Sequence, residues 1–127
     1  MVRNRGNVKM IYGIGVDMIS ISRVARACEK DSFLKHVFSC KEIGLYREKT
    51  DKLAANFAAK EAFSKALGTG VRGFSLPEVE LFRDELGKPY YTFSGRAEEI
   101  ISTLGLRAHV SVTDELDTVV VFAVLEN

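Results

Sequence analysis

The chain has 127 residues, which is the length of one domain with a sizeable core, and 46% of its residues are hydrophobic. Its formal net charge of +1 gives no bulk electrostatic attraction to nucleic acid or to a membrane surface. No apolar stretch reaches the roughly 18 residues of a membrane span, and the two cysteines lack the spacing of a structural zinc site.

The expected elements begin after a polar, basic segment. Residues 1–9 are not followed by the apolar stretch of a signal peptide, so we expect a flexible extension there, with Met10 as an alternative start. Residues 11–17 have the apolar run of a buried strand. Ser20 then begins an amphipathic helix through about Lys30, because apolar residues recur at helical spacing.

Two further helices are expected in the middle of the chain. Ser39 and Glu42 have the spacing of a capping box, which predicts a short helix directly after them. Thr50 or Asp51 is then expected to cap a long helix that runs to about Leu67. On a helical wheel this segment has no continuous polar face, which predicts a largely enclosed helix.

The second half of the chain is predicted to be rich in strands. Four strands are expected, paired as two antiparallel hairpins, over residues 79–83, 90–93, 108–113 and 118–125. A helix from Ser94 to about Leu104 separates the hairpins. We therefore expect a single α+β domain over residues 10–127, in which helices pack on antiparallel sheet.

Asp17 and Glu61 both stand in apolar surroundings. Charge resists burial unless it is paired or bound to a metal. Hard oxygen ligands on two separate elements indicate a divalent cation, and Lys60 and Lys65 beside Glu61 indicate an anionic substrate, so the pattern predicts metal-assisted transfer at a phosphate. Two simpler interpretations remain open. Glu61 pairs with Lys65 one helical turn away on the surface, or Asp17 caps the helix that begins near Ser20.

Two other patterns have both a structural and a functional interpretation. Gly13 and Gly15 lack the third glycine of a dinucleotide-binding loop, and close backbone approach near a strand end explains them better. Arg23, Arg26 and Lys30 are expected on one face of their helix. That face is either a solvated surface or a docking strip for an acidic partner helix.

Taken together, these segments resemble the bacterial holo-acyl-carrier-protein synthases, the small class of 4'-phosphopantetheinyl transferases. The aspartate run and the Lys-Glu helix at this separation are the specific part of the match. The matching segments occur in the family's order, cover nearly all of residues 10–125, and are 13–17, 21–23, 38–39 with Glu42, 57–62, 65–70, 87–89 and 109–113.

The resemblance implies an activity and an assembly. The 4'-phosphopantetheine arm of coenzyme A is transferred to a serine of apo-acyl carrier protein, with release of adenosine 3',5'-bisphosphate, in support of fatty acid biosynthesis. Mg²⁺ is the implied cofactor. Coenzyme A and the apo-carrier are the implied partners, with neither nucleic acid nor membrane among them. The family also implies a homotrimer with active sites between subunits, and two unpaired cysteines in a chain of this kind indicate a cytoplasmic location.

Roles are implied residue by residue. Asp17 and Glu61 hold Mg²⁺ against the pyrophosphate of coenzyme A, and Lys65 stabilises charge on the leaving phosphate, which makes Glu61 and Lys65 the expected catalytic residues. Coenzyme A contacts are implied for Lys60, Lys65, Lys88, Pro89, Ser111 and Thr113. Carrier contacts are implied for Arg23, Arg26 and Lys30.

One residue departs from the family's pattern. Asp114 stands where members commonly have a histidine, and an acid there repels a phosphate unless the metal or a lysine intervenes. Residues 87–89 also fit a simple hairpin turn. Two other classes remain open: a non-catalytic carrier- or nucleotide-binding module with structural acids, and a pyrophosphate-hydrolysing enzyme that uses the same acids and cation.

Overall fold

The computed structural model describes residues 10–127, so the extension expected over residues 1–9 lies outside the described part. The elements in chain order are β1 (Ile11–Ser20), α1 (Ile21–Ala27), α2 (Asp31–Val37), α3 (Cys40–Tyr46), α4 (Thr50–Leu67), the 3₁₀ turn η1 (Leu76–Glu78), β2 (Val79–Arg83), β3 (Pro89–Phe93), α5 (Gly95–Leu104), β4 (Arg107–Glu115) and β5 (Thr118–Glu126). The α+β class is confirmed, and so are both antiparallel hairpins, β2 with β3 and β4 with β5.

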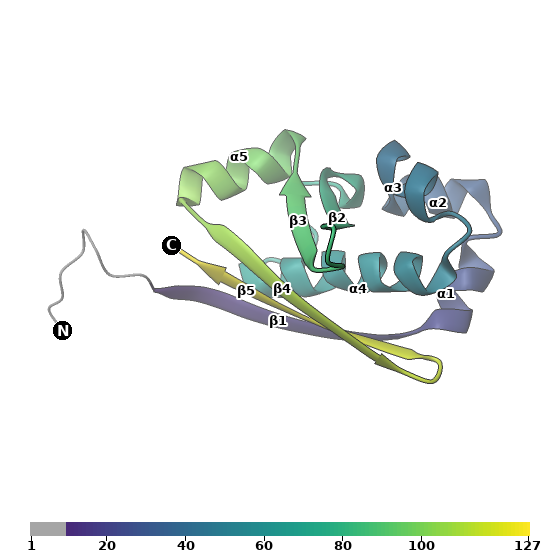
Figure 1. Ribbon diagram of the computed structural model, residues 1–127. Coiled ribbons are helices and arrows are strands. Elements are labelled where there is room, and N and C mark those ends of the chain that lie inside the picture. Colours follow the sequence, from purple (N-terminus) through teal and green to yellow (C-terminus); the bar gives the residue numbers. More distant parts are fainter. Residues whose placement is uncertain (1–9) are drawn as a thin grey trace, which may run out of the picture.

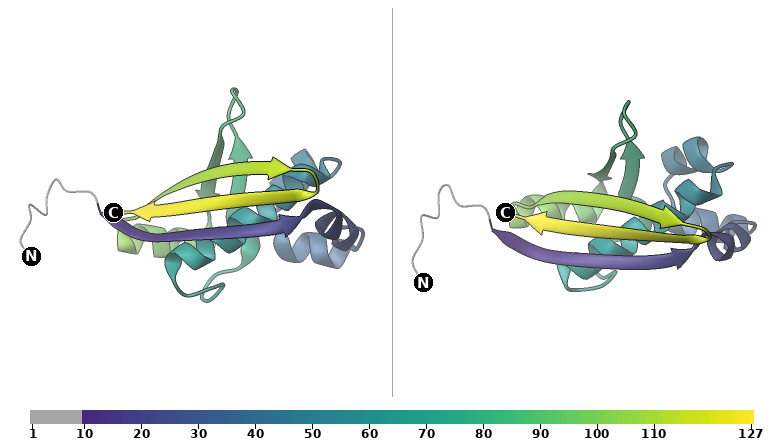
Figure 2. Two further views of the ribbon diagram at one scale, coloured as in Figure 1. Left: turned by 90° about the horizontal axis from the view of Figure 1, so that it is seen from below. Right: turned by 60° about the horizontal axis from the view of Figure 1, so that its bottom comes forward.

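The long helix α4 lies between two sheets. β1, β5 and β4 form a three-stranded antiparallel sheet in that order, while β2 and β3 form a separate two-stranded sheet. Figure 1 shows α4 between the three-stranded sheet below it and β2, β3 and α3 above it. The view from below in Figure 2 shows the outer face of the three-stranded sheet, which no element of residues 10–127 covers. No helix within these residues is long and apolar enough to cross a membrane.

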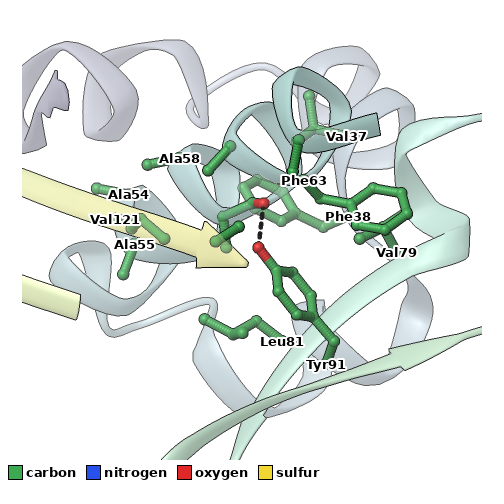
Figure 3. Packing of buried hydrophobic residues seen from close by; sticks show 14 of the residues in the cluster. Val37, Phe38, Ala54, Ala55, Ala58, Phe63, Val79, Leu81, Tyr91 and Val121 are labelled. Carbon is green, nitrogen blue, oxygen red and sulfur yellow. Dashed lines mark hydrogen bonds between the residues drawn. The ribbon is translucent and has the colours of Figure 1, made fainter. Parts of the chain in front are cut away.

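Most of the 18 residues of α4 are buried by other elements of the same chain, which confirms the enclosed helix. Phe63 packs near Tyr91, whose ring centroid is 5.8 Å away, and Figure 3 shows both rings in the cluster with Val79 and Leu81. The Tyr91 hydroxyl donates a hydrogen bond to the Ala59 carbonyl at 2.6 Å, drawn as the dashed line. None of the large apolar side chains that stay exposed within residues 10–127 belongs to this helix, and several of them lie on β1.

β1 contacts α4 without side chains between the two backbones. A Cβ atom at Gly13 would overlap the carbonyl oxygen of Ala66, and a Cβ atom at Gly15 would overlap that of Ala62. This confirms the interpretation of the two glycines as a close backbone approach. The contact places Asp17, two residues further along β1, beside the same helix.

The helix expected from Ser20 to about Lys30 is shorter in the structure. Ser20 caps α1 as predicted, because its hydroxyl accepts a hydrogen bond from the Arg23 amide at 3.2 Å. α1 ends at Ala27, and Lys30 is the residue before a second helix, α2, that we did not predict. The break has no sequence signal because neither glycine nor proline occurs between the two helices. Lys30 therefore does not share a helix face with Arg23.

We predict that Gly15→Ala destabilises the fold by about 3 kcal/mol or more, because the new methyl group must displace helix backbone and not a flexible side chain. Gly44→Ala is the matched control. Gly44 lies in α3 with open space around its Cα, so alanine there should stabilise the protein by about 0.5–1 kcal/mol. Chemical denaturation of both variants measures the difference, and a Gly15→Ala variant as stable as the parent would contradict the close contact.

Candidate active site

Asp17, Glu61 and Lys65 meet where β1 passes over α4. Lys65 Nζ lies 3.3 Å from Asp17 Oδ1 and donates a hydrogen bond to the Val16 carbonyl at 3.0 Å. The Lys65 side chain is 55% exposed and that of Asp17 is 18% exposed. The predicted alternative, a surface pair between Lys65 and Glu61, is thus not the contact that Lys65 makes. Its ammonium group lies against the carboxylate of the neighbouring strand.

Burial and neighbouring charges change the pKa of Glu61. The pKa of Glu61 is raised by partial burial and further by the negative charge of Asp17, while the ammonium group of Lys65 opposes the increase. These two carboxylates and one ammonium group together carry a net negative charge beside a cavity that Arg23 also lines. Such a cluster is stabilised by a cation.

The acids line a pocket of about 620 Å³ between β1, α1, α2 and α4. Magnesium often takes only one or two protein carboxylates and completes its shell with water and substrate phosphates. Asp17 and Glu61 fit that requirement. Residues 10–127 contain no cluster of three or more histidine, cysteine or acidic side chains, which zinc would prefer.

A second, basic groove of about 500 Å³ adjoins this pocket and shares Arg23, Ala27 and Phe33 with it. Arg26 and Lys30 line the groove as well, together with Glu29. The three basic residues expected to form a docking strip are therefore gathered around one groove, although Arg23 and Arg26 lie in α1 and Lys30 lies in the turn before α2. Phe33 was missed by the sequence analysis because its helix, α2, was missed.

Lys60 is inside the protein, in contrast to the phosphate contact expected for it. Its side chain and that of Glu42 are fully buried, with Nζ 2.7 Å from Glu42 Oε1. Nζ also donates to the carbonyl oxygens of Leu76, at 3.1 Å, and Val79. All three ammonium protons are used in these contacts, so the structure does not bring Lys60 to the site.

Glu42 receives further hydrogen bonds. Its carboxylate accepts from the Ser39 amide, as the capping box predicted, and from the Asn56 side chain and the Leu81 amide at 2.8 and 3.1 Å. Glu42 therefore joins α3, α4 and β2 inside the protein. The sequence signal for Glu42 pointed only to a helix cap, because the buried partners come from distant segments.

Lys88 and Pro89 lie at the β2–β3 hairpin, away from the acids. The Lys88 side chain is exposed, and its backbone amide donates to Asp84 Oδ1 at 2.8 Å, so the turn interpretation of residues 87–89 describes their local structure. Pro89 lines a recess of about 170 Å³ with Asp114. Lys52 and Arg83 line the same recess and supply positive charge beside that acid.

Ser111 and Thr113 are on the outer face of the sheet. They lie opposite Phe122 and Val120 in register, whereas Asp17 lies opposite the buried Val121. Successive side chains of a strand point to opposite faces. The structure therefore separates Ser111 and Thr113 from Asp17, Glu61 and Lys65 within one chain.

Comparison with known proteins gives a consistent set of relatives. A model described as the 4'-phosphopantetheinyl transferase superfamily matches residues 13–116. A "Holo-[acyl-carrier-protein] synthase" of Clostridium beijerinckii is 42% identical over 121 residues, covering 92% of this chain and 98% of that protein. A protein of the same name from Dechloromonas aromatica is also 42% identical, and the match covers 93% of this chain and 99% of that protein.

Solved structures agree. The crystal structure of the Neisseria meningitidis holo-[acyl-carrier-protein] synthase superposes with a TM-score of 0.86 at 36% identity. The match covers 93% of this chain and 100% of that chain. The Helicobacter pylori synthase, solved in complex with coenzyme A, superposes with a TM-score of 0.78 at 28% identity. This match covers 88% of this chain and 98% of that chain.

The buried position of Lys60 generates a prediction about stability. Lys60→Met leaves the Glu42 charge buried without its counter-charge, which costs about 3–5 kcal/mol. Lys52→Met is the matched control, because Lys52 pairs with Asp51 at 3.8 Å on the surface and its loss costs under about 1 kcal/mol. Chemical denaturation of both variants measures the two losses in the free energy of unfolding. A Lys60→Met protein of normal stability with weakened coenzyme A binding would return Lys60 to the phosphate role.

Proposed function

The chain belongs to the 4'-phosphopantetheinyl transferase superfamily, as the sequence resemblance indicated, and from its match to the holo-[acyl-carrier-protein] synthases we infer that it is a transferase of this kind. We propose that it moves the 4'-phosphopantetheine arm of coenzyme A to a serine hydroxyl of apo-acyl carrier protein. The products are holo-acyl carrier protein and adenosine 3',5'-bisphosphate.

The observation that carries this proposal is the convergence of Asp17 and Glu61 at a pocket that adjoins a basic groove, with Lys65 hydrogen-bonded to Asp17. The pocket offers hard oxygen ligands and a cation beside them, which suit a pyrophosphate. The groove offers positive charge for an acidic protein. A small phosphate-hydrolysing enzyme needs the first feature but not the second.

In the proposed reaction the serine oxygen forms a bond to the phosphorus that carries pantetheine. The bond from that phosphorus to the bridging oxygen breaks, the serine proton is released, and negative charge gathers on the leaving phosphate. Lys65 is more than half exposed and lies against Asp17, so it can place its ammonium group beside that charge. Its hydrogen bond to the Val16 carbonyl fixes the direction of the side chain.

Asp17 and Glu61 would hold Mg²⁺. When bound, the ion supplies charge stabilisation to the pyrophosphate and orients it. The contribution of the chain is to keep both carboxylates together at one end of the pocket. Burial and, after it, the negative charge of Asp17 raise the pKa of Glu61, and a cation between the two acids would offset that charge.

We propose that the protein is a homotrimer, because the residues to which the resemblance assigns coenzyme A contacts lie on more than one surface of the chain. The outer sheet face carries exposed apolar side chains, including Ile14, Val16 and Met18 at 58%, 50% and 70% exposure. Figure 2 shows that this face is open. If a neighbouring copy packs there, Ser111 and Thr113 of one chain can serve the pocket of another. An active site between subunits would unite residues that a single chain keeps apart.

The cellular setting is part of the proposal. Fatty acid biosynthesis requires acyl carrier proteins in their holo form, and we propose that this chain supplies them in the cytoplasm. Cys28 and Cys40 are free thiols, which agrees with a reducing compartment.

The class of activity is tested by the intact mass of an apo-acyl carrier protein after incubation with this protein, coenzyme A and Mg²⁺. We expect the carrier to gain one phosphopantetheine arm, and chelation of the metal to prevent the gain. Glu61→Gln should reduce the rate by at least about 100-fold, because a metal ligand and its charge are lost. Glu48→Gln, an exposed control, should leave the rate unchanged.

Other results would contradict the proposal. Release of adenosine 3',5'-bisphosphate without carrier modification would indicate a pyrophosphate-hydrolysing enzyme. Carrier binding with no turnover would indicate a non-catalytic module. Normal turnover by Glu61→Gln would remove the metal role from that residue.

Charge reversal tests the docking groove. Arg26→Glu should raise the KM for an acidic carrier at low salt by about fivefold or more, with little change in the KM for coenzyme A. Salt should reduce the difference, because surface charges are screened within about 10 Å at 0.1 M. Arg96→Glu on α5 is the control, since it changes the net charge equally but lies outside the groove. Equal effects of the two reversals would show that only net charge matters.

A further inference from the structure

The turn between β4 and β5 is bonded to the start of α1, far away in the sequence. The carboxylate of Asp117 accepts hydrogen bonds from the Ser20 and Ser22 hydroxyls, both at 2.7 Å, and from the Ser22 amide at 3.0 Å. The carbonyl oxygen of Asp117 accepts from the Ile21 amide at 2.8 Å. Figures 1 and 2 both show this turn beside α1.

These contacts satisfy the amides that an α-helix leaves unpaired at its beginning. Ile21 and Ser22 donate to Asp117, and the Arg23 amide donates to the Ser20 hydroxyl at 3.2 Å. The Ser20 hydroxyl is itself bonded to Asp117, so the local cap is held in place by the distant turn. α1 has only seven residues and is too short to be stable alone, so its position depends on such contacts.

α1 carries the residues that link the pocket to the basic groove. Arg23 lines both, and Arg26 lines the groove. We propose that Asp117 is a positioning residue for carrier docking, which acts by fixing the start of α1 and thereby the direction of Arg23 and Arg26. This inference rests on the proposed function, because it assigns the role of a residue in binding the acyl carrier protein.

Electrostatics alone predicts the opposite effect for Asp117. Its carboxylate is exposed, and the charge of Arg26 contributes to lowering its pKa, after the larger contributions of the hydrogen bonds from Ser20 and Ser22. An acid at this place repels an acidic carrier, so its removal should strengthen binding if charge were the whole effect. If Asp117 acts by positioning α1, its removal weakens binding. The sign of the change therefore separates the two explanations.

The experiment compares Asp117→Ala, Asp117→Asn and Glu115→Gln in steady-state kinetics with an apo-acyl carrier protein and coenzyme A. Asp117→Ala should raise the carrier KM about fivefold to tenfold, while kcat and the coenzyme A KM stay within about twofold. Asp117→Asn removes the same charge but keeps an acceptor oxygen, so it should recover most of the loss. Glu115→Gln is an exposed charge control at the end of β4, two residues before Asp117, and should leave the carrier KM equal or lower.

A carrier KM for Asp117→Ala that is unchanged or reduced would overturn the inference, and so would equal values for Asp117→Ala and Asp117→Asn. Thermal melts establish that each variant is folded. If Asp117→Ala does not fold, Ser22→Ala removes one of the three side-chain contacts, and its carrier KM must then rise, by a smaller factor. Failure of the unmodified protein to modify the carrier would reject the proposed function, whereas normal activity with an unaffected Asp117→Ala rejects only the role of Asp117.

Discussion

The close contact between β1 and α4 determines where the chemistry of this protein lies. Gly13 and Gly15 let the strand touch the carbonyl oxygens of Ala62 and Ala66. At that separation the next side chain on the same strand face, Asp17, reaches Lys65 at 3.3 Å, and its negative charge adds to the effect of burial in raising the pKa of Glu61. Any residue larger than glycine would push the strand away from the helix. The two halves of the charged cluster would then separate, because they come from different elements.

The opposite side of α4 is fixed by a buried polar network. Lys60 and Glu61 are neighbours in sequence, yet Lys60 points to Glu42 in the interior and Glu61 lines the pocket. Consecutive residues of a helix differ by about 100° in direction, which is enough to separate an interior lysine from a surface carboxylate. The network resists rotation or sliding of α4, because breaking its hydrogen bonds would leave further buried donors and acceptors unpaired. The position of Glu61 depends on this constraint as much as on the glycine contact.

Local signals predicted most of the elements, while contacts between distant segments were the usual source of error. The capping box at Ser39 and the two hairpins follow from short sequence patterns and are present in the structure. The break between α1 and α2 was missed because no glycine or proline marks it. Lys60 was expected to contact a phosphate because it stands next to Glu61 in the sequence. Its actual partner, Glu42, is 18 positions away, and no local pattern links the two residues. The pairing of Asp17 with Lys65 likewise joins residues 48 positions apart.

The two faces of the three-stranded sheet have different environments. Its inner face, through Val121 and its neighbours, packs on α4, and the strand alternation that buries Val121 leaves Val16 and Phe122 exposed on the other face. Large apolar side chains gathered on an open face usually mark a surface that another protein covers. Ser111, opposite Phe122, is polar and stands within that surface. A polar residue among apolar ones at an interface needs a partner of its own, and a phosphate-bearing ligand held against the neighbouring chain would provide one. The same alternation that builds the core therefore places Ser111, part of the proposed coenzyme A site, on the face that we propose a second copy of the chain covers.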